Sequence, residues 1–99
     1  MPIFRKRPVR IEAVQLDQEN AEAVAQWCNG NLERTLSYGY DFVEALIIPT
    51  LEGDMRCAVG DWVVRGMAGE FYPVKDFIFE STYESVDDGL RETFSDDQW

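Results

Sequence analysis

The chain has no histidine among its 99 residues, and this absence excludes a large part of enzyme chemistry. Histidine supplies the base of catalytic triads, most proton transfer near neutral pH and the commonest nitrogen ligand of zinc. Only acid pairs, Lys75, the tyrosines or a thiol remain as reacting groups. The sequence therefore predicts a protein that is not an enzyme and that uses neither a metal nor another cofactor.

Cysteine and long apolar runs are also scarce. Cys28 and Cys57 lack the spacing of a metal site, and we expect both to be reduced, buried, small apolar residues. No apolar run approaches the ~20 residues that cross a bilayer. The charged start, residues 1–7, lacks the apolar stretch that a secretory signal needs after it. We therefore expect a cytoplasmic protein that is not bound to a membrane.

Positive charge is the third scarcity, with 9 Lys and Arg against 19 Asp and Glu and a net charge of −10. Four of the cations fall within the first ten residues, so the rest of the chain is strongly acidic. This balance disfavours direct binding of nucleic acid or anionic membranes. It is compatible with binding to a basic protein, and the acidic surface could then mimic a nucleic-acid backbone. The alternative is that the charge serves solubility alone.

What is present predicts one α+β domain over residues 1–86, followed by an acidic, mobile tail at 87–99. We expect a small, mainly antiparallel sheet of about five or six strands with one helix on one face. Residues 18–29 carry that helix, because their apolar residues recur at helical spacing and Asn29-Gly30 is a typical stop. A short helical turn is predicted near 76–82, and a final short strand at 83–86.

The strands are read from alternation and turn signals. Residues 8–16, 34–38, 43–50 and 55–58 are expected as strands, with Ile48 facing Cys57 across a Glu-Gly turn. Residues 59–74 are expected as a central hairpin in which Arg65 lies opposite Glu70. In that register the apolar face consists of Trp62, Val64, Phe71 and Pro73.

Several segments carry a resemblance to known proteins. They are Thr50–Met55, Val59–Gly66, Gly69–Lys75, Ile78–Glu80 and Thr82–Glu84, with an opening at Lys6–Ala13. In these segments the chain resembles a family of short phage and prophage proteins with the pattern Gly-Asp-aromatic, Gly-Glu-x-Tyr-Pro-Val-Lys and Phe-Glu-x-Thr-Tyr-Glu. The chain departs from the family at Asp76-Phe77, where the family often has proline and then an acid. The resemblance implies a phage gene product in the cytoplasm of an infected bacterium, with no catalytic residues to transfer.

The candidate binding residues are aromatic and charged side chains beside glycines. They are Tyr38, Tyr40, Trp62, Arg65, Glu70, Tyr72, Lys75 and Trp99. Tyrosines beside a glycine occur in binding loops, and more often in ordinary packing at a loop. Asp61 and these charged and aromatic residues could form a polar patch for binding. Their roles could instead be structural, with Asp61 forming a turn, Trp62 packing in the core, and Arg65 and Glu70 fixing the register of the hairpin. Phe94 and Trp99 could dock on the domain or contact a partner.

These features favour a non-enzymatic phage accessory protein that binds a host protein through an acidic surface, as an inhibitor of host or anti-phage defence machinery. The alternative is a binder of a small anionic ligand, such as a signalling nucleotide, held by Arg65, Lys75, Tyr72, Tyr38 and Tyr40. A small structural protein associated with the virion is a second alternative. A homodimer through exposed strand edges is compatible with each of them.

Overall fold

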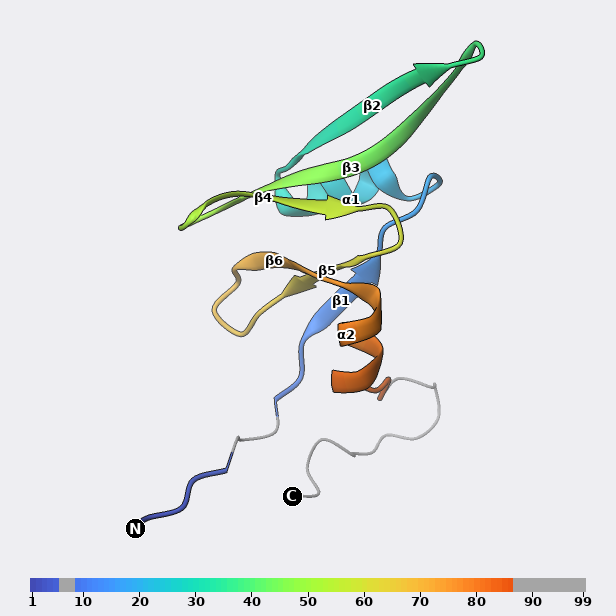
Figure 1. Cartoon of the computed structure of the whole chain (residues 1–99). Coiled ribbons are helices and arrows are strands. Elements are labelled where there is room, and N and C mark those ends of the chain that lie inside the picture. Colours follow the sequence, from blue (N-terminus) through green and yellow to red (C-terminus); the bar gives the residue numbers. More distant parts are fainter. Residues whose placement is uncertain (6–8, 87–99) are drawn as a thin grey trace.

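The computed structural model describes residues 1–5 and 9–86 (Figure 1). In chain order the elements are β1 (Glu12–Gln15), α1 (Ala21–Cys28), β2 (Asn31–Ser37), β3 (Tyr40–Thr50), β4 (Gly53–Ala58), β5 (Trp62–Arg65), β6 (Phe71–Val74) and α2 (Asp76–Thr82). Neither helix of this described part has the length and apolarity needed to cross a bilayer.

The α+β class is confirmed, but the strands form two sheets and not one. Strands β2, β3 and β4 make one antiparallel sheet in that order, and β1, β5 and β6 make the other in the order β1-β5-β6. The chain changes sheet between β4 and β5, where Gly60 has a φ of 101° and the Asp61 N–H donates to the Ala58 carbonyl at 2.9 Å. This tight reversal points β5 away from the first sheet (Figure 1), so a single continuous sheet cannot form.

The core lies where α1 and the two sheets meet. The predicted apolar face of the helix is buried in full, and its side chains pack with Leu16, Ile48, Val63 and other buried residues. Trp27 of α1 meets Phe71 of β6 edge to face, with ring centroids 4.9 Å apart, which ties the helix to the second sheet. Burying aromatic and branched side chains in this way supplies most of the favourable free energy of folding.

Helix α1 begins three residues later than predicted. The Asp17 carboxylate accepts hydrogen bonds from the N–H groups of Glu19 and Asn20, both at 2.8 Å, and this turn precedes the helix. The predicted stop is confirmed, with Asn29 in the left-handed region at a φ of 59°. At Gly30 a Cβ atom would lie 2.6 Å from the Ile47 carbonyl oxygen, so no larger residue fits between the helix end and β3.

The hairpin of β5 and β6 is confirmed, but its predicted register is wrong by one residue. Arg65 lies opposite Phe71, because Glu70 belongs to the loop: its carboxylate accepts from the Ala68 N–H at 3.0 Å. A slip of one residue exchanges the faces of one strand. Trp62, Val64, Tyr72 and Val74 therefore share one face, and Val63 and Phe71, which belong to the core beside α1, share the other.

Other strand limits and registers also differ from prediction, and β2, β3 and β4 begin two or three residues earlier than the predicted strands 34–38, 43–50 and 55–58. In the β3–β4 hairpin Ile48 faces Met55, two residues from the expected partner Cys57, and an even shift leaves both side chains on their predicted faces. Strand β1 is shorter than residues 8–16. The strand expected at 83–86 is wrong, because the chain leaves α2 there without regular structure. The tail predicted at 87–99, with Phe94 and Trp99, lies outside the described residues.

Candidate functional site

The β2–β3 hairpin projects from the rest of the fold (Figure 1), and its outer end carries four large exposed side chains. The turn consists of Tyr38 and Gly39, whose φ angles of 51° and 79° define a type I′ turn. The exposed fractions are 73% for Leu36, 96% for Tyr38, 73% for Tyr40 and 37% for Phe42. These four residues are called the aromatic tip below.

Strand alternation spreads the aromatic tip over both faces of the hairpin. Tyr40 and Phe42 point to one face, and Leu36 points to the other, on which Val43 is buried near α1. Tyr38 stands at the end of the turn. A partner would therefore meet apolar surface on the end and on both sides of the hairpin.

A side-chain bridge holds the acidic segment before α1 against this hairpin. The Gln18 amide donates to the Val43 carbonyl at 2.7 Å and accepts from the Val43 N–H at 2.9 Å. Hydrogen-bonded and non-hydrogen-bonded pairs alternate along the β2–β3 ladder, starting with the bonded pair of Ser37 and Tyr40 beside the turn. The pair of Arg34 and Val43 is therefore non-bonded, and the N–H and carbonyl of Val43 face away from β2. The Gln18 side chain satisfies both of these backbone groups, and this contact brings its sequence neighbours Asp17 and Glu19 to the side of the hairpin.

The surroundings of the aromatic tip are acidic. One guanidinium, that of Arg34, lies among these side chains and pairs with Glu22 at 2.9 Å and Asp41 at 3.5 Å. Glu22 and Asp41 belong to this group by their contact with Arg34, and Asp17, Glu19 and Glu44 belong to it as the sequence neighbours of the bonded pair Gln18 and Val43. The group, called the acidic flank below, has a net charge of −4.

The root of the hairpin is held by an ion pair across the central strand. Arg56 of β4 contacts Glu33 of β2 at 2.8 Å, above Ala45 of β3, which is fully buried. Glu33 raises the pKa of the Arg56 guanidinium through its hydrogen bond and charge. The β2 register skips Glu44, and this bulge puts Val43 on the same face as Leu46 and Ile48, which all belong to the core. The tip thus extends from a fixed base.

The residues predicted as a polar patch around Asp61 have structural partners. Asp61 accepts from the Asp76 N–H at 3.2 Å and contacts the Lys75 ammonium at 3.3 Å. Asp76 accepts from the Trp62 indole N–H at 2.9 Å, and Trp62 stacks on Phe79 with centroids 4.0 Å apart. This network fastens α2 to the second sheet.

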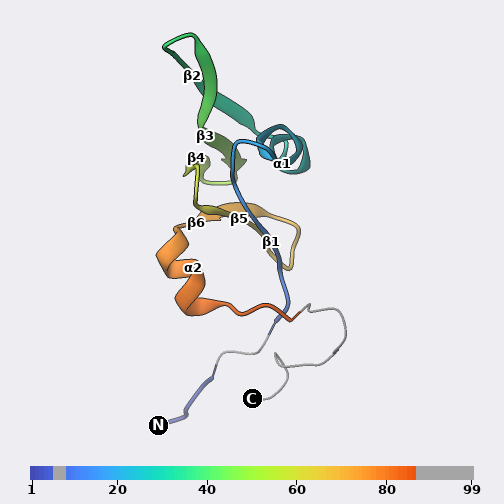
Figure 2. The same cartoon turned by 90° about the vertical axis from the view of Figure 1, so that its right-hand side faces the viewer.

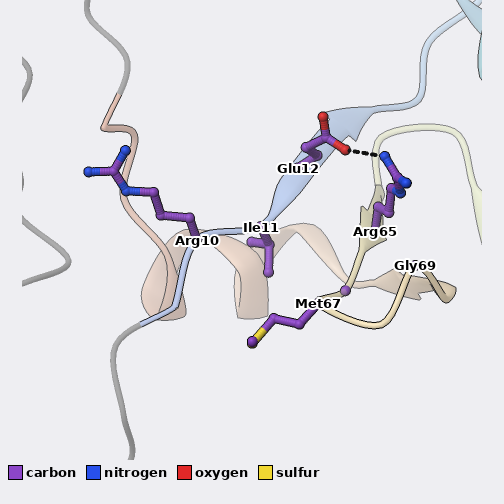
Figure 3. Close-up of a pocket in the computed structure, with 7 residues that line it drawn as sticks. Arg10, Ile11, Glu12, Arg65, Met67 and Gly69 are labelled. Carbon is purple, nitrogen blue, oxygen red and sulfur yellow. Dashed lines mark hydrogen bonds and ion pairs between the residues drawn. The ribbon is translucent and has the colours of Figure 1, made fainter.

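Arg65 is also paired, and not with the predicted partner Glu70. It contacts Glu12 of β1 at 2.9 Å on the wall of a shallow pocket of about 370 Å³ (Figure 3). The close-up shows the Arg10 side chain directed away from this pair. A carboxylate already on the guanidinium weakens the pocket as a site for an anionic ligand.

The structure does not bring the predicted ligand-binding residues together. Tyr38 and Tyr40 stand at the end of the first sheet, whereas Arg65, Tyr72 and Lys75 belong to the second sheet and its exit (Figure 1). Tyr72 is half-buried, and burial together with a hydrogen bond to Tyr83 raises the pKa of its hydroxyl. These residues do not form one pocket.

The thiols do not supply a reactive group. Cys28 and Cys57 are buried and unbonded to each other, as predicted. Burial raises the pKa of the Cys57 thiol to about 12 and that of Cys28 in the same direction. Thiolates are the nucleophilic form, so neither sulfur is activated. Among residues 1–5 and 9–86, no group of three or more acids and cysteines is arranged to hold a metal ion.

Sequence reasoning found Tyr38 and Tyr40 but missed Leu36, Phe42 and the acidic flank. The missed signal was the apolar residue at every second position from 36 to 42, running straight through a Tyr-Gly turn. Trp99, the remaining predicted site residue, is outside the described residues.

Comparison of the chain with protein-family models, with curated proteins and with solved structures finds no match. The resemblance to phage and prophage proteins therefore stays a prediction, and the argument for function depends on the geometry of the hairpin.

Proposed function

We propose that this chain is a non-enzymatic, phage-encoded binding protein whose aromatic tip docks on a basic surface of a host bacterial protein. In this proposal it acts in the host cytoplasm and inhibits host or anti-phage defence machinery. The observation that carries the proposal is Tyr38, a bulky residue with a φ of 51° and a side chain that is 96% exposed.

Tyr38 is locally unfavourable where it stands. An ordinary L-residue in the left-handed region costs roughly 1–2 kcal/mol, and type I′ turns favour asparagine at this position for that reason. Because the side chain is exposed, packing within the described chain does not offset that cost. A residue held in an unfavourable conformation is a pointer to function, and contact with a partner is the role that an exposed tyrosine suits best.

The acidic flank indicates what kind of surface the partner has. Its charge of −4 would repel the same flank on a second copy and attract a surface rich in Lys and Arg. Tyrosine and leucine at the centre, surrounded by charged groups, match the usual layout of an interface with an apolar core and a polar rim. This arrangement favours a basic protein over a homodimer at the hairpin.

The test is affinity capture from a bacterial lysate at low salt, with the full chain as bait and quantitative mass spectrometry as readout. The bait variants are Tyr38→Ser with Tyr40→Ser, and Asp41→Asn with Glu22→Gln. The matched control is Leu51→Ser, since Leu51 is fully exposed on the β3–β4 turn at the other end of the same sheet.

We expect one basic protein that the wild type and Leu51→Ser retain, that both hairpin variants lose, and that raised salt releases. Exposed charge pairs are screened over about 10 Å at 0.1 M salt, which gives the salt dependence its physical cause. Equal retention by the wild type and the tyrosine variant would contradict the proposal.

A further inference from the structure

We infer that the groove between α2 and the segment entering β1 is a second recognition site, for a short peptide with apolar side chains flanked by Lys or Arg. The groove lies on the second sheet, away from the aromatic tip. It does not depend on the proposed role of the hairpin, and Figure 2 shows α2 and β1 on its two sides.

Register explains why this part of the sheet stays apolar and open. Ala13 lies opposite Val64 and shares its face with Ile11 and Trp62, on the side of the sheet that α2 covers. Helix α2 sits over Trp62, where Phe79 stacks on the indole, and does not reach across to Ile11. The floor between them is left as a groove.

One wall of the groove consists of aromatic side chains from α2 and the residue after it. Phe79 and Tyr83, with centroids 4.8 Å apart, continue the Trp62 stack along one side. The Asp76 carboxylate accepts a hydrogen bond from the Trp62 indole N–H. This bond fixes the orientation of the indole, so the aromatic wall is already in place before a ligand binds. A wall of this kind loses little conformational entropy on binding, which favours affinity.

The size of the groove suits a short peptide. Its volume of about 840 Å³ falls within the range of roughly 300–1,000 Å³ that is typical of ligand sites. An extended segment rises about 3.3 Å per residue, so a few residues would follow residues 9–13 along its length. The lining is mainly apolar, with Ile11, Ala13, Trp62, Phe79, Tyr83 and Val86 among its residues.

The charged side chains at the rim of the groove determine which residues the peptide should carry on either side of its apolar centre. Among the lining residues, the exposed carboxylates of Glu80 and Glu84 outnumber the guanidinium of Arg10, because Glu12 is already paired with Arg65. With a chain charge of −10, the field over the groove favours cations. An apolar centre with basic flanks therefore fits, whereas an acidic peptide of the same size does not.

The test uses the full chain labelled with ¹⁵N and a fluorescent peptide of three Lys-Leu repeats, at 150 mM salt. The peptide controls have Glu in place of Lys, or Ser in place of Leu. The groove variants are Glu80→Lys with Glu84→Lys, which reverses the rim charge, and Thr82→Trp, which fills the groove from an exposed position. The charge control is Glu52→Lys with Asp54→Lys on the distant β3–β4 hairpin.

We expect saturable binding of the Lys-Leu peptide alone, with a shift of the Trp62 indole N–H resonance. Each groove variant should weaken it about tenfold or more, while the distant charge control and Tyr38→Ser change it less than about threefold. Equal weakening by the distant control would show unspecific charge attraction and overturn the inference. So would binding without a shift at Trp62, or no saturable binding. Loss on Tyr38→Ser alone would move the peptide site to the hairpin.

Discussion

Replacing Tyr38 with asparagine should stabilise the folded chain while weakening its interaction with a partner. Asparagine accepts the left-handed conformation that the turn requires, so most of the roughly 1–2 kcal/mol cost of holding an ordinary residue there disappears. Little packing is lost, because the tyrosine side chain is 96% exposed. We expect a net gain of about 1 kcal/mol, which corresponds to a rise in Tm of about 4–8 °C for a domain of this size.

The assay is thermal and urea unfolding followed by circular dichroism, with Tyr40→Asn as the matched control. Tyr40 is a strand residue opposite Ser37, and asparagine is a poor strand former. That variant should lose up to about 1 kcal/mol. If Tyr38→Asn lowers Tm, the tyrosine is making a stabilising contact inside the chain, and the reasoning that assigns it to a partner is refuted.

Three further predictions concern the framework that supports the sites. Gly30→Ala should lower the free energy of unfolding by about 1–3 kcal/mol, measured by urea unfolding, because its Cβ would meet the rigid Ile47 carbonyl; Gly66→Ala, whose Cβ meets a flexible side chain, should cost less. Asp76→Ala should cost about 1–3 kcal/mol and change the fluorescence of Trp62, whose indole N–H loses its acceptor; an unchanged spectrum would contradict the network. Burial raises the pKa of Cys57 to about 12 from an ordinary value of 9.0, so the folded state holds its proton more tightly. The stability from that thiol is complete below pH 9 and is lost between pH 9 and 12, and thiol reagents at pH 8 should label the protein only as it unfolds.

The helices and most strands could be predicted because their signals are local. The face of α1 follows from apolar residues at helical spacing, and all four of them are buried. Tyr38–Asp41 is predicted as a turn or loop because of its glycine, and the observed turn is its first half, Tyr38 and Gly39. Such patterns depend on neighbouring residues, which the sequence contains in full.

The errors arose where a distant or loop contact decides the outcome. Glu70 folds onto the Ala68 N–H and lengthens the loop, so Arg65 pairs with Glu12, which lies 53 residues away in the sequence. The division into two sheets depends on how the chain turns at Gly60, and no periodicity records that direction. A one-residue slip in register and a change of sheet both leave the alternation of residues along each strand unchanged, so this alternation cannot predict them.

Only part of the candidate site could be predicted, because the rest depends on contacts between residues that are distant in the sequence. Two tyrosines beside a glycine marked the turn, but their exposure depends on the packing of the folded chain around them. The acidic flank needs the Gln18 bridge to Val43, which joins residues 25 apart in the chain. Sequence alone could not choose between a packed loop and a binding loop.

The central claim is that the aromatic tip contacts a basic protein, and site-specific photo-crosslinking in bacterial cells tests it most directly. A photoreactive phenylalanine derivative replaces Tyr38 in one variant and Leu51 in another, since both side chains are almost fully exposed at opposite ends of one sheet. The account predicts one adduct with a basic protein from position 38 that position 51 does not give and that Asp41→Asn with Glu22→Gln reduces. The same adducts from both positions, or none from position 38, would contradict it.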